Sequence, residues 1–93
     1  MLGTYALYKN EHDFYTARPF SGNSLRVLEE TNCDYYMTID TNGIAVHTRK
    51  DNQTLKELLI HCPKCRAFLI RKHSAFNNAR TQVFQCIICH LKP

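Results

Sequence analysis

Two pairs of cysteines stand in the last third of the chain, and two residues separate the members of each pair. The first pair is Cys62 and Cys65, and the second is Cys86 and Cys89. This spacing turns both sulfurs to one side of a tight loop, called a knuckle, and two knuckles brought together supply four thiolates for a tetrahedral metal site. We therefore predict one structural Zn²⁺ held by Cys62, Cys65, Cys86 and Cys89.

The alternatives are two disulfides or four free thiols. A fifth cysteine, Cys33, makes the count odd and argues against a simple disulfide framework. We expect Cys33 to be a small buried apolar residue. His61 and His90 flank the knuckles, and either of them could replace a cysteine as a ligand. Four thiolates leave no open coordination position, so the zinc would be structural and not catalytic.

The length of 93 residues suits a single compact domain over residues 1–93, made of a β-rich region (1–59) and a zinc module (60–93). A chain of this size has a marginal core, so a structural metal would matter for its stability. The N-terminus lacks the basic start and apolar run of a signal peptide, and no apolar stretch is long enough to span a bilayer. We expect no membrane association and an intracellular, cytoplasmic or nuclear, location.

The charge is divided unevenly along the chain. Residues 1–60 carry six of the 12 Lys and Arg residues and all 8 Asp and Glu residues, whereas residues 61–93 carry six Lys and Arg and no carboxylate side chain. A metal module without carboxylates is typical of a surface that meets a polyanion. An ordinary solvated basic surface is the alternative.

The β-rich region contains one strong local pattern, a hairpin from Asp34 to Lys50. Asn42 and Gly43 suit a two-residue type I′ turn, which would pair Ile39 with Val46, Met37 with Thr48 and Thr41 with Ile44. Strands are also expected over residues 2–8 and 14–17. Residues 25–30 fit either a helical turn or a strand, and the β context favours a strand. The predicted core face of the hairpin is Tyr35, Met37, Ile39, Ile44 and Val46.

A short connection leads from the hairpin into the first knuckle. Residues 54–57 have the Thr-x-x-Glu form of a capping box, so we expect at most one short helix, near residues 52–59. Leu58, Leu59 and Ile60 would form the seam between the two regions. The expected fold is therefore small, mixed and mainly β, with an N-terminal sheet packed on a C-terminal zinc module with four cysteine ligands.

The segment between the knuckles reads as a β-hairpin, with strands over 67–73 and 80–85 joined by residues 74–79. This segment, with the sequence motifs Cys-Pro-x-Cys and Gln-x-Phe-x-Cys-x-x-Cys at its ends, resembles the zinc ribbons of some transposases, phage late-gene activators and transcription-elongation proteins. The resemblance covers only about residues 60–90. The acidic pair that elongation factors carry at the hairpin tip has no counterpart here, so stimulation of transcript cleavage is not implied.

Two functions fit this pattern. In the first, the module binds nucleic acid without sequence specificity, with RNA or single strands favoured because aromatic side chains could stack on unpaired bases. In the second, the protein is a zinc-stabilised adaptor or inhibitor that binds host or transcription machinery, in the style of a viral or phage accessory factor. The residues predicted to contact nucleic acid are Lys64, Arg66, Phe68, Arg71, Lys72, His73, Phe76 and Arg80.

An enzyme is not expected. Some metal-dependent endonucleases place a His and Asn site between two knuckles, and His73, Asn77 and Asn78 occupy that place here. Such a site normally needs a second His or Asp to hold a catalytic metal and activate water. The neighbour of His73 is Lys72, and the segment has no carboxylate. We therefore expect no catalytic residue and no small-molecule substrate.

Overall fold

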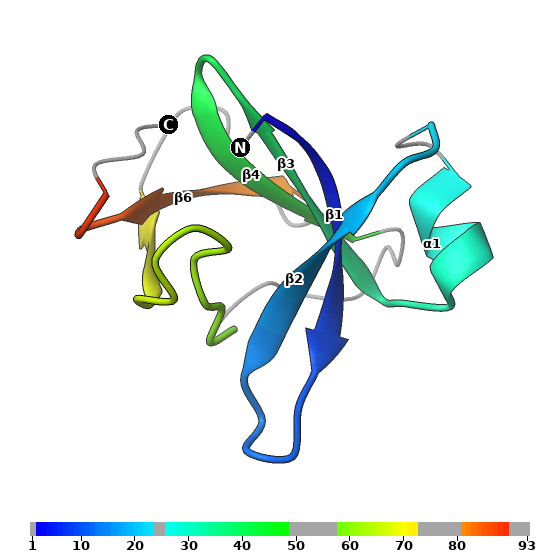
Figure 1. Ribbon diagram of the computed structural model, residues 1–93, viewed down its shortest axis with the longest axis horizontal. Coiled ribbons are helices and arrows are strands. Elements are labelled where there is room, and N and C mark those ends of the chain that lie inside the picture. Colours follow the sequence, from blue (N-terminus) through cyan, green and yellow to red (C-terminus); the bar gives the residue numbers. More distant parts are fainter. Residues whose placement is uncertain (1, 24–25, 49–57, 73–80, 90–93) are drawn as a thin grey trace.

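A computed structural model describes residues 2–23, 26–48, 58–72 and 81–89. This part of the chain is mainly β, as the sequence predicts: it forms a six-stranded antiparallel sheet in the order β2-β1-β3-β4-β6-β5, with one helix of five residues outside it (Figure 1). The elements are β1 (Gly3–Lys9), β2 (Tyr15–Phe20), α1 (Val27–Thr31), β3 (Tyr35–Asp40), β4 (Gly43–Thr48), β5 (Leu69–Lys72) and β6 (Thr81–Cys86).

The helix α1 corrects the strand that was expected over residues 25–30. Val27 is fully buried whereas Glu29 and Glu30 are exposed, and the two carboxylates lie in the first turn, where they interact favourably with the helix dipole. Asn32 ends the helix in the left-handed conformation, with φ 57°. The helix that was expected near residues 52–59 falls largely on residues 49–57, which lie outside the described part.

The β3–β4 hairpin has the predicted core face but a different register. The observed pairs are Ile39 with Ile44 and Met37 with Val46. All three predicted pairs are therefore wrong, namely Ile39 with Val46, Met37 with Thr48 and Thr41 with Ile44. The cause is Asp40, whose Oδ1 accepts hydrogen bonds from the N–H groups of Asn42 (2.8 Å) and Gly43 (3.2 Å). This Asx turn begins one residue earlier than the expected type I′ turn.

Moving the turn by one residue changes the partner of each strand residue by two positions. Strand side chains alternate between the two faces with a period of two, so each side chain stays on its predicted face. All five predicted core residues are therefore buried, with exposed fractions from 0% for Met37 and Val46 to 7% for Tyr35. On the other face, His47 stacks on Tyr36 with a centroid distance of 4.6 Å.

Strand β6 carries the C-terminal module into the same sheet as the N-terminal region. It pairs with β4 on one side, as in Ile44 with Phe84, and with β5 on the other, as in Leu69 with Cys86. The antiparallel β5–β6 pair confirms the two strands expected between the knuckles. Their connection, residues 73–80, lies outside the described part.

Residues 59–62 join the two edges of the sheet. On one side, the Tyr15 N–H of β2 donates to the Leu59 carbonyl (2.7 Å) and the His61 N–H donates to the Tyr15 carbonyl (3.0 Å). On the other side, the Leu69 N–H of β5 donates to the Ile60 carbonyl (2.8 Å). The sheet therefore curls round until this short segment connects β2 to β5.

The main core fills the inside of this curled sheet. It includes Ile60, Phe84, Cys62 and Cys86, the last two exposed by only 1% and 0%. Leu58 packs against the core but Leu59 is 47% exposed, so the predicted seam is wrong at Leu59, because alternation turns that side chain outwards. A second cluster lies under α1 and contains Ala6, Val27 and Cys33. Cys33 is buried there, as expected.

Candidate metal centre

The four knuckle cysteines come together although they lie in two separate parts of the chain. Their sulfur atoms all lie within 4.8 Å of one another, in an arrangement that could hold a metal ion. The Sγ atoms of Cys65 and Cys86 lie 3.3 Å apart, and those of Cys62 and Cys89 lie 3.5 Å apart. A disulfide bond would bring two sulfurs to about 2.05 Å. The four thiols are free, which excludes the predicted alternative of two disulfides in this structure.

These distances fit tetrahedral coordination. Four sulfurs about 2.3 Å from one ion form a tetrahedron whose edges are about 3.8 Å long. The observed distances lie on both sides of that value, so small shifts would suffice to place an ion among the four sulfurs. The donor set is entirely sulfur, which selects soft or borderline metals over Mg²⁺ and Ca²⁺.

The first knuckle is shaped by its own main chain. The Cys62 N–H donates to the Ala67 carbonyl (2.7 Å), and the Arg66 N–H donates back to the Cys62 carbonyl (2.9 Å). Arg66 adopts a left-handed conformation with φ 64° to complete this tight turn. Both sulfurs are thereby turned to one side, as the C-x-x-C spacing predicts.

The second knuckle follows directly from β6. Cys86 is the last residue of that strand, so its position is fixed by pairing with Leu69 of β5. The Cys89 N–H donates to the Cys86 sulfur (3.5 Å), which is the kind of contact that stabilises a thiolate. The sheet therefore positions Cys86 directly. It also positions the start of the first knuckle, because Ile60 accepts a hydrogen bond from Leu69 of β5.

The thiols differ in their acidity before any metal binds. Burial alone would raise the pKa of Cys86, but the N–H groups of Cys89 and Ile88 and the neighbouring thiols outweigh burial and lower that pKa to about 6. Burial and hydrogen bonds to the other three cysteines raise the pKa of Cys89 to about 12. The sulfurs thus resist ionising together, and a bound cation would compensate the like charges that four thiolates create.

His61, which precedes the first knuckle, is not part of this cluster. The His61 Nδ1 lies 2.9 Å from the Arg66 carbonyl and its ring stacks on Phe68, so its contacts are with the protein. His90 lies outside the described residues.

No known protein family, curated protein or solved structure matches this chain. Of the described residues, only α1 is helical, and it is too short to cross a membrane.

The residues predicted to contact nucleic acid fall into two groups. The cations Lys64, Arg66, Arg71 and Lys72 are all exposed, and Arg71 donates to the Gln82 side chain (3.1 Å). His73, Phe76 and Arg80 lie outside the described residues. The four described cations belong to the first knuckle and to β5, so the sheet brings them to one module.

Phe68 is 46% exposed and belongs to a small aromatic cluster with Phe14 and His61. Its ring stacks on His61 at a centroid distance of 4.9 Å and meets Phe14 edge-on at 5.3 Å. The sequence offered no reason to associate Phe14 with the module, because only the pairing of Tyr15 with residues 59–61 brings it there.

Exposed isoleucines are a feature that the sequence analysis missed. Ile70, Ile87 and Ile88 are 49%, 55% and 61% exposed, and all three lie on β5 or the second knuckle. Extending the observed register by one residue would place Ile87 opposite Phe68, on the outer face that also carries Ile70. The sequence feature that could have indicated two of them is the apolar pair Ile87 and Ile88 between Cys86 and Cys89.

Proposed function

We propose that this protein is a zinc-stabilised nucleic-acid-binding protein, in which one Zn²⁺ on the four cysteines holds a basic module that binds RNA or single strands without sequence specificity. The observation that carries the proposal is the exposure of Lys64, Arg66, Arg71 and Lys72 in a segment, residues 58–93, that has no Asp or Glu. The aromatic cluster beside them supports it, because bases stack on exposed aromatic rings.

Zinc is proposed as the metal for chemical reasons. Four cysteine thiolates form a closed tetrahedral set, which is the usual ligand set of structural zinc and leaves no position for a substrate or water. When bound, the ion would supply cross-linking and charge compensation, and no catalysis is proposed. Metal analysis of the purified protein should find one zinc per chain.

Binding is tested with a fluorescent single-stranded RNA and the zinc-loaded protein. If the four described cations meet phosphates, the logarithm of the association constant should fall with the logarithm of salt concentration with a slope of about −3. A slope near zero would overturn the proposal.

Charge-matched variants locate the surface. Lys64→Gln combined with Arg71→Gln should make the slope shallower by about 1.4, since each phosphate contact contributes about 0.7. The control is Lys9→Gln combined with Arg26→Gln, which removes the same charge from residues far in sequence from the cysteine module. In the wild type, Lys9 pairs with Asp13 and Arg26 pairs with Glu30. Equal loss of binding in both variants would show attraction by net charge alone.

The exposed isoleucines favour a second candidate function, that of a protein adaptor or inhibitor. Apolar side chains at Ile70, Ile87 and Ile88 gain little from contact with phosphates, whereas protein interfaces bury such groups. Ile70→Ser combined with Ile87→Ser should abolish recovery of a stoichiometric protein partner in nuclease-treated purifications. It should leave RNA binding unchanged if the two functions use different surfaces.

A further inference from the structure

The outer edge of β2 offers main-chain hydrogen-bonding groups that the sheet does not use. Along a strand of an antiparallel pair, the N–H and C=O groups of one residue point towards the neighbouring strand. Those of the next residue point away from it, and the pattern repeats every two residues. Both groups of Tyr15 point away from β1, because they bond to Leu59 and His61. Two residues further on, the N–H and C=O of Ala17 must point the same way, as must the C=O of Pro19.

Pro63 explains why the pairing stops after Tyr15. The next pair of hydrogen bonds would run from the Ala17 N–H to the His61 carbonyl, and from the N–H of residue 63 to the Ala17 carbonyl. Proline has no N–H, so the second of these bonds cannot form, and the chain turns into the first knuckle instead. Within the described part of the chain, neither bond is present, and the only bridge to this edge is at Tyr15.

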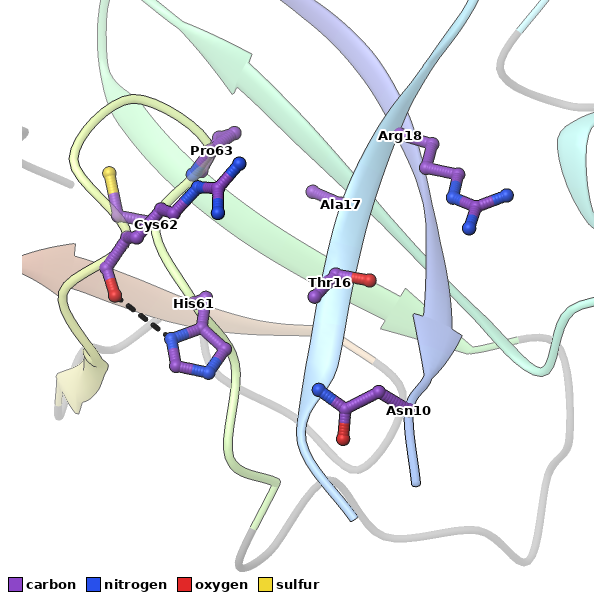
Figure 2. A pocket seen from close by; sticks show the side chains of 8 residues that line it. Asn10, Thr16, Ala17, Arg18, His61, Cys62 and Pro63 are labelled. Atoms are coloured by element: carbon purple, nitrogen blue, oxygen red, sulfur yellow. Dashed lines mark hydrogen bonds between the residues drawn. The ribbon is translucent and has the colours of Figure 1, made fainter. Parts of the chain in front are cut away.

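A cleft of about 530 Å³ lies where the pairing ends, between β2 and the first knuckle. This volume is within the range of sites that bind ligands, about 300–1,000 Å³. Figure 2 shows Ala17 on the side of β2 that faces Cys62 and Pro63, and Arg18 on the other side. Ala17, Arg18, Pro63 and Arg66 are among the residues that line it, and none of the lining residues is a carboxylate.

We propose that this cleft binds an extended acidic peptide segment of a partner protein, which adds as a short strand to the open edge of β2. Main-chain groups at Ala17 and Pro19 would supply the hydrogen bonds, as in other cases of strand addition. Arg66 would meet a carboxylate on the added segment, whereas the Arg18 guanidinium lies over the ring of Tyr8, 4.7 Å from its centroid. The inference goes beyond the proposed nucleic-acid binding, because it assigns a peptide ligand to the edge of β2, although Arg66 belongs to both sites.

The peptide is favoured over nucleic acid by the nature of the unused groups. One N–H and two carbonyls in strand register match the alternating donors and acceptors of an extended polypeptide. The phosphate groups of a nucleic acid accept hydrogen bonds but offer no donors to the Ala17 and Pro19 carbonyls, and the only backbone donors of RNA are its 2′-hydroxyls. The absence of carboxylates among the lining residues, and the presence of the exposed Arg66, favour an acidic sequence over a basic one.

The probes are two capped octapeptides, one of alternating valine and glutamate and its twin of alternating valine and lysine. Each is added to the zinc-loaded, ¹⁵N-labelled protein at neutral pH and low salt, and the amide resonances are followed by NMR. The expected result is a saturable shift of the Ala17 amide with the glutamate peptide, and binding at least fivefold weaker with the lysine peptide.

Ala17→Pro tests the main-chain contact. Its ring would replace the N–H on the open edge while leaving the hydrogen bonds to β1 intact, as Pro19 already does at the equivalent position two residues on. The glutamate peptide should bind this variant at least about fivefold more weakly, which corresponds to the loss of one net hydrogen bond. The control, Ala17→Ser, keeps the N–H and should bind within twofold of the wild type.

A second measurement avoids the risk that Ala17→Pro disturbs the fold. With the wild-type protein, the glutamate peptide is methylated on alternate amide nitrogens, which removes donors from one edge and keeps every side chain. Methylation of one edge should abolish binding, and methylation of the other should not. Equal effects of both, no shift of the Ala17 amide up to millimolar peptide, or equal binding of the lysine peptide would each overturn the proposal.

Two other outcomes would assign the edge to a different occupant and so also overturn it. One is a shift of the Ala17 amide by single-stranded RNA that the glutamate peptide cannot displace. The other is self-association of the protein without peptide that Ala17→Pro abolishes, since this would show pairing of β2 with a second copy. Loss of RNA binding in the Lys64 and Arg71 variants does not bear on this test.

Discussion

At the scale of single residues, the five cysteines divide into four that cluster where they could hold a metal ion and one that packs under α1. Cys89→Ser should lower the zinc content well below one per chain and lower the midpoint of thermal unfolding, because three thiolates remain where four are needed. Cys33→Ala is the control: Cys33 lies in the separate cluster under α1, so this variant should keep full zinc content. Both contents are measured by elemental analysis. Equal zinc loss in the two variants would contradict the four-cysteine centre.

His47 should make stability depend on pH. Burial lowers the pKa of His47 below its usual value of about 6.5. The ring lies on Tyr36, and its two nitrogens contact the hydroxyls of Thr38 (2.9 Å) and Thr81 (3.2 Å). Protonation is therefore easier in the unfolded chain, and the unfolded chain binds more protons in the window between the lowered pKa and about 6.5.

The sign follows from that difference. The contribution of a neutral His47 is fully present above pH about 6.5 and is lost as the pH falls towards the lowered pKa. Denaturant unfolding of the zinc-loaded protein should therefore show a smaller free energy of unfolding at pH 5.5 than at pH 7.5. His47→Gln should reduce this decrease, and the difference between the two proteins isolates His47 from the thiols. An unchanged decrease would show that His47 does not contribute.

At the scale of elements, the β3–β4 turn depends on one carboxylate. Asp40→Ala removes the acceptor of the Asn42 and Gly43 N–H groups and should lower the free energy of unfolding by about 1 kcal/mol. Asp40→Asn keeps an oxygen at the same place and should cost less than half as much. Chemical denaturation of the three proteins measures both values. If Asn costs as much as Ala, the negative charge matters and the hydrogen bonds do not.

The same turn shows what a sequence can predict in this fold. The alternation of apolar and polar side chains identified the core face from Tyr35 to Val46. A register shift of two residues keeps every side chain on the same face of the sheet, so the prediction of burial was not affected by it. The register was missed, because Asp40 and Asn42-Gly43 offer competing turns that differ by one residue. Short elements such as α1 were missed for a similar reason: five residues carry too little periodicity to separate a helical turn from a strand.

The clustering of the four knuckle cysteines was predictable for a different reason. The ligands of each knuckle lie within four residues of each other, so local spacing carries most of the information. The closure of the sheet was not predictable, since it depends on the pairing of Tyr15 with residues 59–61, far apart in the chain. No local pattern specifies such a contact, and the cleft beside Pro63 follows from it.

At the scale of the whole molecule, the four-cysteine cluster is built into the sheet. Strand β6, which ends at Cys86, lies between β4 and β5, so it is an inner strand and not an appended one. Cys62 and Cys86 belong to the same buried cluster as Met37 and Val46. The binding energy of a structural zinc, on the order of 10 kcal/mol, is comparable with the stability of an entire small domain.

Removal of the metal should therefore unfold the sheet as a whole. We expect EDTA to abolish the native NMR signals of Met37 in β3 and Phe84 in β6 together, at the same chelator concentration, and added zinc to restore both. The physical reason is that, without the ion, the end of β6 at Cys86 loses its cross-link to the first knuckle, which weakens the pairing of β6 with β4. A core this small contributes little further stability. Met37 is the sensitive probe, since it is fully buried and distant in sequence from every ligand. If its signal stayed native while that of Phe84 was lost, the β-rich region would fold on its own and the zinc would stabilise only the C-terminal module.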